Sequence, residues 1–175
     1  YLDAVAELEP YVDFYKIASY ELLWKELFVE CAKTGKPIVF STGMATIDEI
    51  KDALNSISGH KTIEVTILKC TSAYPTPAQE ANLKAIKTLG NQFGSTYNGL
   101  KISYGYSDHT RSDNVINRAV HHYNISFLEF HLDLDGKGEE YKSGHCWLPN
   151  EMQSVIQTIK SDLEEIESEI KNNLE

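Results

Sequence analysis

Two histidines in this sequence could hold a catalytic metal ion. His109 and His131 each follow a short run of β-branched and aromatic residues, so both are expected at the ends of neighbouring strands. Two imidazoles leave coordination positions for water, substrate or a carboxylate, and such an open site suits Mn²⁺, Fe²⁺ or Mg²⁺ better than a closed structural zinc. Two histidines hydrogen-bonded in the rim of a core would explain the same spacing equally well. His145, in a later loop, is a weaker candidate.

One lysine and four serines could bind an anion. Lys16 lies inside an otherwise apolar run, where an unpaired ammonium is costly, so it should be neutralised by a bound anion or by a neighbouring acid. A third interpretation is an amine kept neutral for Schiff-base chemistry. Hydroxyl groups at the ends of such runs can donate to phosphate or carboxylate oxygens, although single serines more often cap helices or form turns. These hydroxyls belong to Ser19, Ser41, Ser72 and Ser107.

The elements that must position these side chains alternate regularly. Short apolar runs predict five strands, across residues 12–18, 37–41, 63–69, 100–104 and 125–131, with a polar linker at 94–99. Apolar residues at helical spacing predict helices across 22–31, 47–57, 83–89, 115–120 and 149–170. This order predicts an α/β fold with parallel strands, either an open doubly wound sheet or a (β/α) barrel, in which ligands bind at the carboxyl ends of the strands.

Length and composition narrow the possibilities further. A complete (β/α)8 barrel needs about 250 residues, so about five units in 175 residues predict an incomplete TIM-type barrel in one domain, residues 1–175. The formal charge of −10 argues against nucleic-acid and anionic-membrane partners, and no apolar run is long enough for a membrane span. Three widely spaced cysteines suggest no disulfide framework, which favours a reducing, cytoplasmic setting.

Four segments in series resemble the sialic acid (N-acetylneuraminate) synthase family of phosphoenolpyruvate-condensing enzymes. They are residues 15–19 (YKIAS), 35–44 (GKPIVFSTGM), 70–77 (CTSAYPTP) and 105–110 (GYSDHT). The resemblance covers nearly the whole chain but only strands four to eight of the family's barrel. It implies that the first three strands and the C-terminal antifreeze-like domain are absent, and that the full-length parent is a homodimer. A chain without those parts is not expected to complete a catalytic cycle.

The resemblance implies a reaction and a role for each candidate residue. Phosphoenolpyruvate would condense with N-acetylmannosamine or a related amino-sugar aldehyde, with release of phosphate and with Mn²⁺ or Mg²⁺ polarising the aldehyde. His109 and His131 would be the metal ligands. The phosphate and carboxylate of phosphoenolpyruvate would be bound by Lys16, Ser19, Ser41, Ser72 (often Asn in the family) and Ser107. Glu21 would assist proton transfer, with Lys16 also in a catalytic role, and Tyr74 would face the sugar.

One departure from the family pattern concerns the acceptor sugar. The family usually has a Gly-Pro-Asp element after the second histidine, whereas residues 133–141 read DLDGKGEEY here. Glu139 or Glu140 would take the place of the aspartate, and we assign Glu140 to sugar binding. Two other functions stay open: a Schiff-base aldolase that uses Lys16, and a half-barrel that binds small molecules without catalysis.

Overall fold

Six parallel strands form one curved sheet. The computed structural model describes residues 1–172. Within it, neighbouring strands lie in the order β1 (Tyr15–Ile17), β2 (Ile38–Ser41), β3 (Glu64–Cys70), β5 (Leu100–Asp108), β6 (Phe127–Leu132) and β7 (Cys146–Trp147). Every neighbouring pair in this series is parallel. Spatial order therefore follows chain order, as repeated β-α units with crossovers of one hand require.

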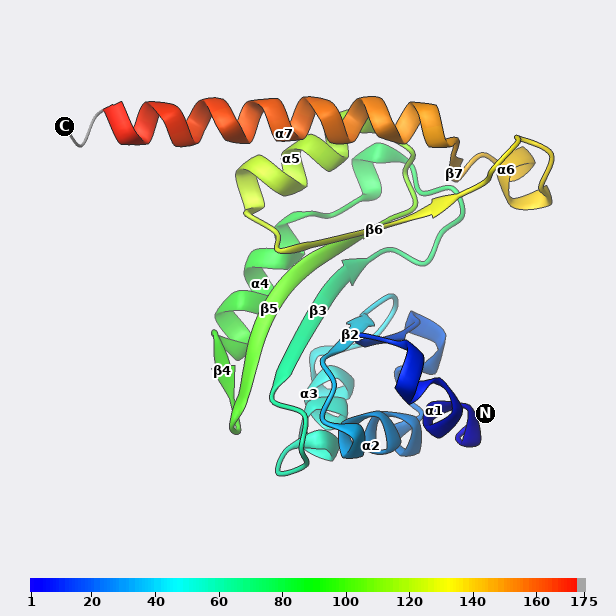
Figure 1. The fold of residues 1–175 in the computed structure, drawn as a ribbon, viewed down its shortest axis with the longest axis vertical. Coiled ribbons are helices and arrows are strands. Elements are labelled where there is room, and N and C mark those ends of the chain that lie inside the picture. Colours follow the sequence, from blue (N-terminus) through cyan, green and yellow to red (C-terminus); the bar gives the residue numbers. More distant parts are fainter. Residues whose placement is uncertain (173–175) are drawn as a thin grey trace.

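The helices cover the convex side of this sheet. In Figure 1, α2 (Lys25–Thr34), α3 (Ile47–Ile57), α4 (Lys84–Phe93), α5 (Asp113–Tyr123) and α7 (Pro149–Asn172) follow one another around the outside. The shorter helices are α1 (Asp3–Leu8), α6 (Glu139–Ser143) and the 3₁₀ turns η1 (Glu9–Tyr11), η2 (Ser19–Glu21) and η3 (Ala78–Glu80). The fold is a parallel α/β half-barrel, which agrees with the prediction of an incomplete TIM-type barrel.

Two local features depart from the predicted elements. The expected polar linker contains β4 (Thr96–Tyr97), which pairs antiparallel with the start of β5 through a turn at Asn98 and Gly99. Both turn residues have positive φ, as a tight hairpin turn requires. The fourth predicted strand also continues through Gly105 to Asp108. A Cβ on Gly105 would lie 2.3 Å from the carbonyl oxygen of Phe127, so glycine allows the close approach of β6.

The core lies between the sheet and the helices. Ile38, Phe40 and Ile67 of the sheet pack with Phe28 of α2 and Leu54 of α3, all fully buried. Helix α3 begins at a complete capping box, which satisfies backbone N–H groups at its first turn. Helix α7 adds a separate cluster in which Met152, Val155 and Ile159 pack on Ile116 and Trp147. Within residues 1–172, no helix combines the length and the apolar character needed to cross a bilayer.

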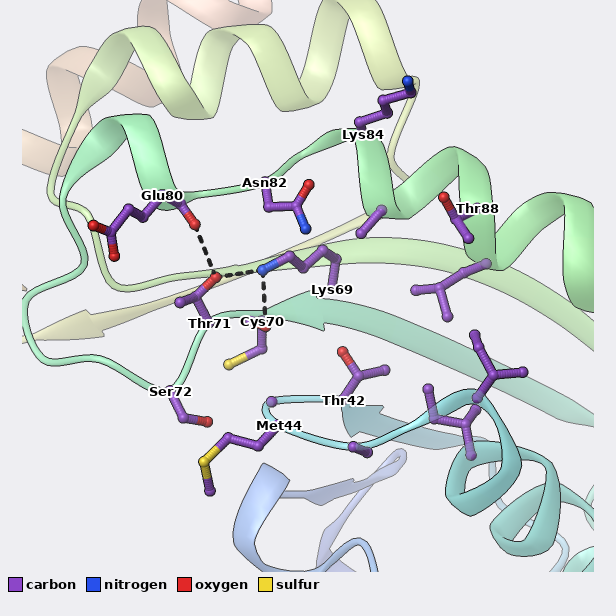
Figure 2. A pocket seen from close by; sticks show the side chains of 16 residues that line it. Thr42, Met44, Lys69, Cys70, Thr71, Ser72, Glu80, Asn82, Lys84 and Thr88 are labelled. Atoms are coloured by element: carbon purple, nitrogen blue, oxygen red, sulfur yellow. Dashed lines mark hydrogen bonds between the residues drawn. The ribbon is translucent and has the colours of Figure 1, made fainter.

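A lysine is buried in the layer between sheet and helices. Lys69 of β3 is only 6 % exposed, and its Nζ donates to the carbonyl oxygen of Cys70 at 2.9 Å and to the hydroxyl of Thr71. Figure 2 shows this ammonium beside a cavity of about 590 Å³ between α3 and α4. No ion pair of the described residues includes Lys69. Burial lowers the pKa of Lys69 from 10.5 to about 8.

This burial predicts a pH dependence of stability. Between about pH 8 and 10.5 the unfolded chain carries a proton on Lys69 that the folded chain has lost, so Lys69 contributes a positive slope to the unfolding free energy as a function of pH, against the opposite contribution of the buried thiols. The expected slope is up to about 1.4 kcal/mol per pH unit, and Lys69→Met should remove it. Urea unfolding of both proteins at pH 7.5 and 10 measures the difference. Lys84→Met, at an exposed position on the same cavity, should keep the wild-type slope; equal slopes in wild type and Lys69→Met would contradict the prediction.

Candidate functional site

The candidate residues gather where the parallel strands end. Register pairs Cys70 of β3 with Ser107 of β5 and Ser107 with Glu129 of β6, so these three side chains share one row across the sheet. Ser107 is 3 % exposed. The row lies at the carboxyl ends of the strands, the edge at which parallel α/β folds bind their ligands.

Lys16 reaches across the concave face to an acid on a distant strand. Its Nζ lies 3.0 Å from Oε2 of Glu129 and donates to the carbonyl oxygen of Ile17 at 3.2 Å. Ser41 donates to the same Glu129 oxygen at 3.3 Å. Since β1 and β6 are not neighbours in the sheet, this contact spans the half-barrel. The expectation that an acid or an anion neutralises Lys16 is therefore met by Glu129.

Glu129 is a residue that the sequence reasoning did not assign. Its signal was its position two residues before His131 on one strand, because alternating side chains of a strand share a face. Nothing in the local sequence identifies Lys16 as its partner, since 113 positions separate the two residues (129 − 16).

Two of the predicted serines meet around a glycine. Ser19 Oγ and Ser72 Oγ lie 3.4 Å apart, within hydrogen-bond distance. Gly43, in the loop after β2, has φ +50°, and a Cβ there would lie 2.5 Å from Ser19 Cβ and 2.7 Å from Ser72 Oγ. Glycine at this position therefore permits three loops to converge beside the ends of β1, β2 and β3.

His109, His131 and Tyr74 form an aromatic cluster at the ends of β5 and β6. The ring centroids of the two histidines are 5.0 Å apart, and the Tyr74 ring is 4.1 Å from that of His109 and 5.7 Å from that of His131. His109 Nδ1 lies 2.7 Å from the carbonyl oxygen of Thr71, an acceptor that requires the proton on Nδ1. This leaves the Nε2 lone pair of His109 available to a metal ion.

The electrostatic surroundings keep His109 in the form that ligates metals. Burial, reinforced by neighbouring His131, lowers the pKa of His109 below its ordinary value, although the Thr71 carbonyl opposes the shift. The imidazole is therefore neutral near pH 7. Asp108, fully buried, accepts hydrogen bonds from the backbone N–H groups of Thr110 at 3.0 Å and Arg111 at 3.1 Å, and so orders the turn that carries His109.

Glu140, assigned to the sugar, lies beside the histidines. Its Oε2 is 3.5 Å from His131 Nδ1 and 3.8 Å from His145 Nε2. Its neighbour Glu139 instead forms an ion pair with Lys142 at 2.5 Å. Glu21 lies half-buried in η2, and among the described residues its side chain has no hydrogen bond or ion pair with the other candidates. The structure thus places Lys16 and Ser41 together at Glu129, and Ser19 beside Ser72 at Gly43. His109, Tyr74 and Glu140 lie around His131, and Glu21 lies apart.

The chain is similar in sequence to curated sugar-acid synthases. It is 33 % identical over 149 residues to pseudaminic acid synthase of Helicobacter pylori, covering 85 % of this chain and 42 % of that protein. It is 39 % identical over 123 residues to N,N'-diacetyllegionaminic acid synthase of Campylobacter jejuni, covering 69 % of this chain and 34 % of that protein. The chain therefore spans less than half the length of these curated relatives.

Solved structures share the fold. The spore coat polysaccharide biosynthesis protein SpsE of Bacillus subtilis superposes with a TM-score of 0.82 at 24 % identity, over 96 % of this chain and 46 % of that chain. N-acetylneuraminic acid (sialic acid) synthetase of Leptospira borgpetersenii, in complex with citrate, gives 0.75 at 26 % identity, over 95 % of this chain and 60 % of that chain. The profile of the NeuB family matches residues 1–171, and the chain described above belongs to that family.

Proposed function

We propose that this chain is the part of a nonulosonic acid synthase that condenses phosphoenolpyruvate with an amino-sugar aldehyde, such as N-acetylmannosamine, and releases phosphate. The observation that carries the proposal is the pair of groups at the strand ends: an ammonium with serine hydroxyls, and two adjacent imidazoles. Membership of the NeuB family and the names of the curated relatives support it. The five longer parallel strands would correspond to strands four to eight of the complete barrel.

The first group would bind phosphoenolpyruvate. Lys16 supplies a positive charge that Glu129 and Ser41 hold in place, so the ammonium needs little reorganisation when an anion arrives. Ser19 and Ser72, side by side next to Gly43, can donate to phosphate or carboxylate oxygens, and Ser107 lies in the row between Cys70 and Glu129. An ammonium paired with a carboxylate suits anion binding better than nucleophilic attack, which favours the synthase over the Schiff-base aldolase.

The second group fits a divalent metal ion. His109 and His131 present imidazoles with centroids 5.0 Å apart, and the hydrogen bond of His109 Nδ1 to Thr71 directs its other nitrogen outward. His109 and His131 would hold Mn²⁺ or Mg²⁺, which supplies Lewis-acid polarisation of the acceptor carbonyl when bound. The two protein ligands leave open coordination positions, as a catalytic site requires.

The remaining candidates would handle the proton and the sugar. Glu21 follows Ser19 within η2, so it stands at the rim, where a carboxylate can exchange protons with water and substrate. Tyr74 stacks on the histidine cluster, and burial raises the pKa of its hydroxyl, so it stays protonated and can donate a hydrogen bond to a sugar oxygen. Glu140, on exposed α6, would accept from sugar hydroxyls. The full-length parent would be a cytoplasmic homodimer.

Replacing Lys16 tests the anion site. Lys16→Ala should weaken phosphoenolpyruvate binding by about tenfold or more, because a charge-assisted hydrogen bond contributes about 1.5 to 3 kcal/mol. Calorimetric titration of the folded chain measures the affinity. Lys25→Ala, which removes an exposed lysine paired with Asp52, is the matched control and should bind as wild type does. Unchanged affinity in Lys16→Ala, or a carbonyl substrate trapped on Lys16 by borohydride, would count against the proposal.

Replacing His109 tests the metal site. His109→Ala should lower Mn²⁺ affinity by more than about tenfold, since loss of even an outer-shell partner of a metal site costs about that much. Electron paramagnetic resonance of free Mn²⁺ during titration gives the affinity directly. His60→Ala, in an exposed turn between α3 and β3, should leave Mn²⁺ binding unchanged. Phosphoenolpyruvate should also bind more tightly with Mn²⁺ present; equal Mn²⁺ affinity in wild type and His109→Ala would refute the assignment.

A further inference from the structure

A second cluster of metal-ligating side chains includes His131. It consists of His131, Glu140, His145 and Cys146, whose potential ligand atoms all lie within 4.8 Å of one another. Glu140 Oε2 is at the centre of the contacts. It lies 3.5 Å from His131 Nδ1, 3.8 Å from His145 Nε2 and 3.8 Å from Cys146 Sγ.

The three distances to Glu140 Oε2 are close to those between ligands around one tetrahedral ion, and no two ligand atoms of the cluster lie more than 4.8 Å apart. Metal–nitrogen and metal–oxygen distances of about 2.1 Å in a tetrahedral zinc site put neighbouring ligand atoms about 3.4 Å apart, and a thiolate at about 2.3 Å lies about 3.6 Å from an oxygen ligand. The three distances to Glu140 Oε2 exceed these values by only a few tenths of an ångström. Small side-chain movements would therefore close the four ligands around a cation.

The protein already orients and shields two of these ligands. His145 Nδ1 lies 2.8 Å from Ser143 Oγ, which leaves Nε2 to face Glu140. An outer hydrogen bond of this kind is the usual way in which a metal-binding imidazole is held. His145 is 4 % exposed and Cys146 is 2 % exposed, so both ligands lie in a dry environment. Glu140, on α6, is largely exposed and would close the site from the solvent side.

One short segment of the chain brings the four ligands together. His131 pairs in register with Cys146 where β6 meets β7, and the segment between them returns through α6, which carries Glu140. All four ligands therefore lie between residues 131 and 146 of the chain.

We propose that His131, Glu140, His145 and Cys146 form a tetrahedral site for a thiophilic divalent cation of the Zn²⁺ class. Two imidazoles, one carboxylate and one thiolate are ligands that Zn²⁺ prefers and that Mg²⁺ does not. Binding would release the proton of the Cys146 thiol to solvent, because the thiolate is the ligating form. The four protein ligands would fill the coordination sphere, in contrast with the open position between His109 and His131.

His131 belongs both to this site and to the proposed catalytic pair with His109, so the following consequence rests on the proposed function. A neutral imidazole carries one lone pair, so His131 can ligate only one cation at a time. A cation bound by Cys146 would therefore withdraw His131 from His109, and it would also withdraw Glu140 from the acceptor sugar. Zn²⁺ and Mn²⁺ would compete for the chain rather than fill two sites together.

Cobalt is the probe for this site. Titration of the full chain with Co²⁺ should saturate at one equivalent and give the intense visible bands of tetrahedral Co²⁺ together with a near-ultraviolet thiolate-to-cobalt charge-transfer band; Zn²⁺ should then abolish both. Cys146→Ser should lose the charge-transfer band and weaken Zn²⁺ binding by more than about tenfold. Cys31→Ser, at a thiol equally buried at 2 % exposure in α2, should behave as wild type.

Two further variants make the outcome decisive. His109→Ala should keep the cobalt spectrum, because His109 is not a ligand of this site, although it should lose Mn²⁺ affinity. A spectrum lost in His109→Ala and kept in Cys146→Ser would overturn the Zn²⁺ site while leaving the proposed catalytic pair intact. His145→Gln provides a second ligand deletion if Cys146→Ser does not fold. The absence of tetrahedral bands in the folded wild-type chain would also overturn the proposal.

Discussion

Parallel pairing places the carboxyl ends of all six strands at one edge of the sheet, and the whole candidate site depends on this constraint. Residues far apart in the chain meet because each strand contributes its terminal residue and the loop that follows. The contact of Lys16 with Glu129 requires more than pairing, since it joins β1 to β6 across the concave face. Curvature of the sheet brings these strands close enough for an ion pair, so the shape of the half-barrel and the charge arrangement of the site depend on each other.

The two faces of the sheet accommodate lysine in different ways. Lys16 points to the concave face, remains partly exposed and is paired with a carboxylate, so its positive charge is retained and held in position. Lys69 points to the convex face, is buried, and has only a carbonyl and a hydroxyl as partners. Burial without a carboxylate lowers the pKa of Lys69 to about 8, so it is mostly protonated at neutral pH and loses its proton in mildly alkaline solution. A lysine paired with a carboxylate and a lysine with a lowered pKa thus lie on one sheet.

Sequence reasoning succeeded where the signal is local. The short apolar run that ends at Ser41 identifies a strand because it is rich in β-branched residues. The stretches before and after it have the apolar spacing of helices instead. It failed where a feature depends on a neighbour in space. The predicted strand 100–104 ended before Gly105, whose lack of a side chain allows Phe127 of β6 to approach. The Asn98-Gly99 turn carried a hairpin signal that the surrounding polar residues obscured. Glu129 could be assigned only once β6 was seen opposite β1.

The surroundings of His131 illustrate the same limit for chemistry. Its partnership with His109 follows from the order of adjacent parallel strands, which a sequence can reveal. Its proximity to Glu140, His145 and Cys146 depends on the path of the segment through α6 and back to β7, for which the spacing 131, 140, 145 and 146 corresponds to no familiar metal motif. His131 Nδ1 faces Glu140, so the orientation of the imidazole ring determines which neighbouring groups its two nitrogens can contact. One segment, the connection between β6 and β7, therefore accounts for two features. It contains the departure from the family pattern in residues 133–141, and it determines the ligand environment of His131.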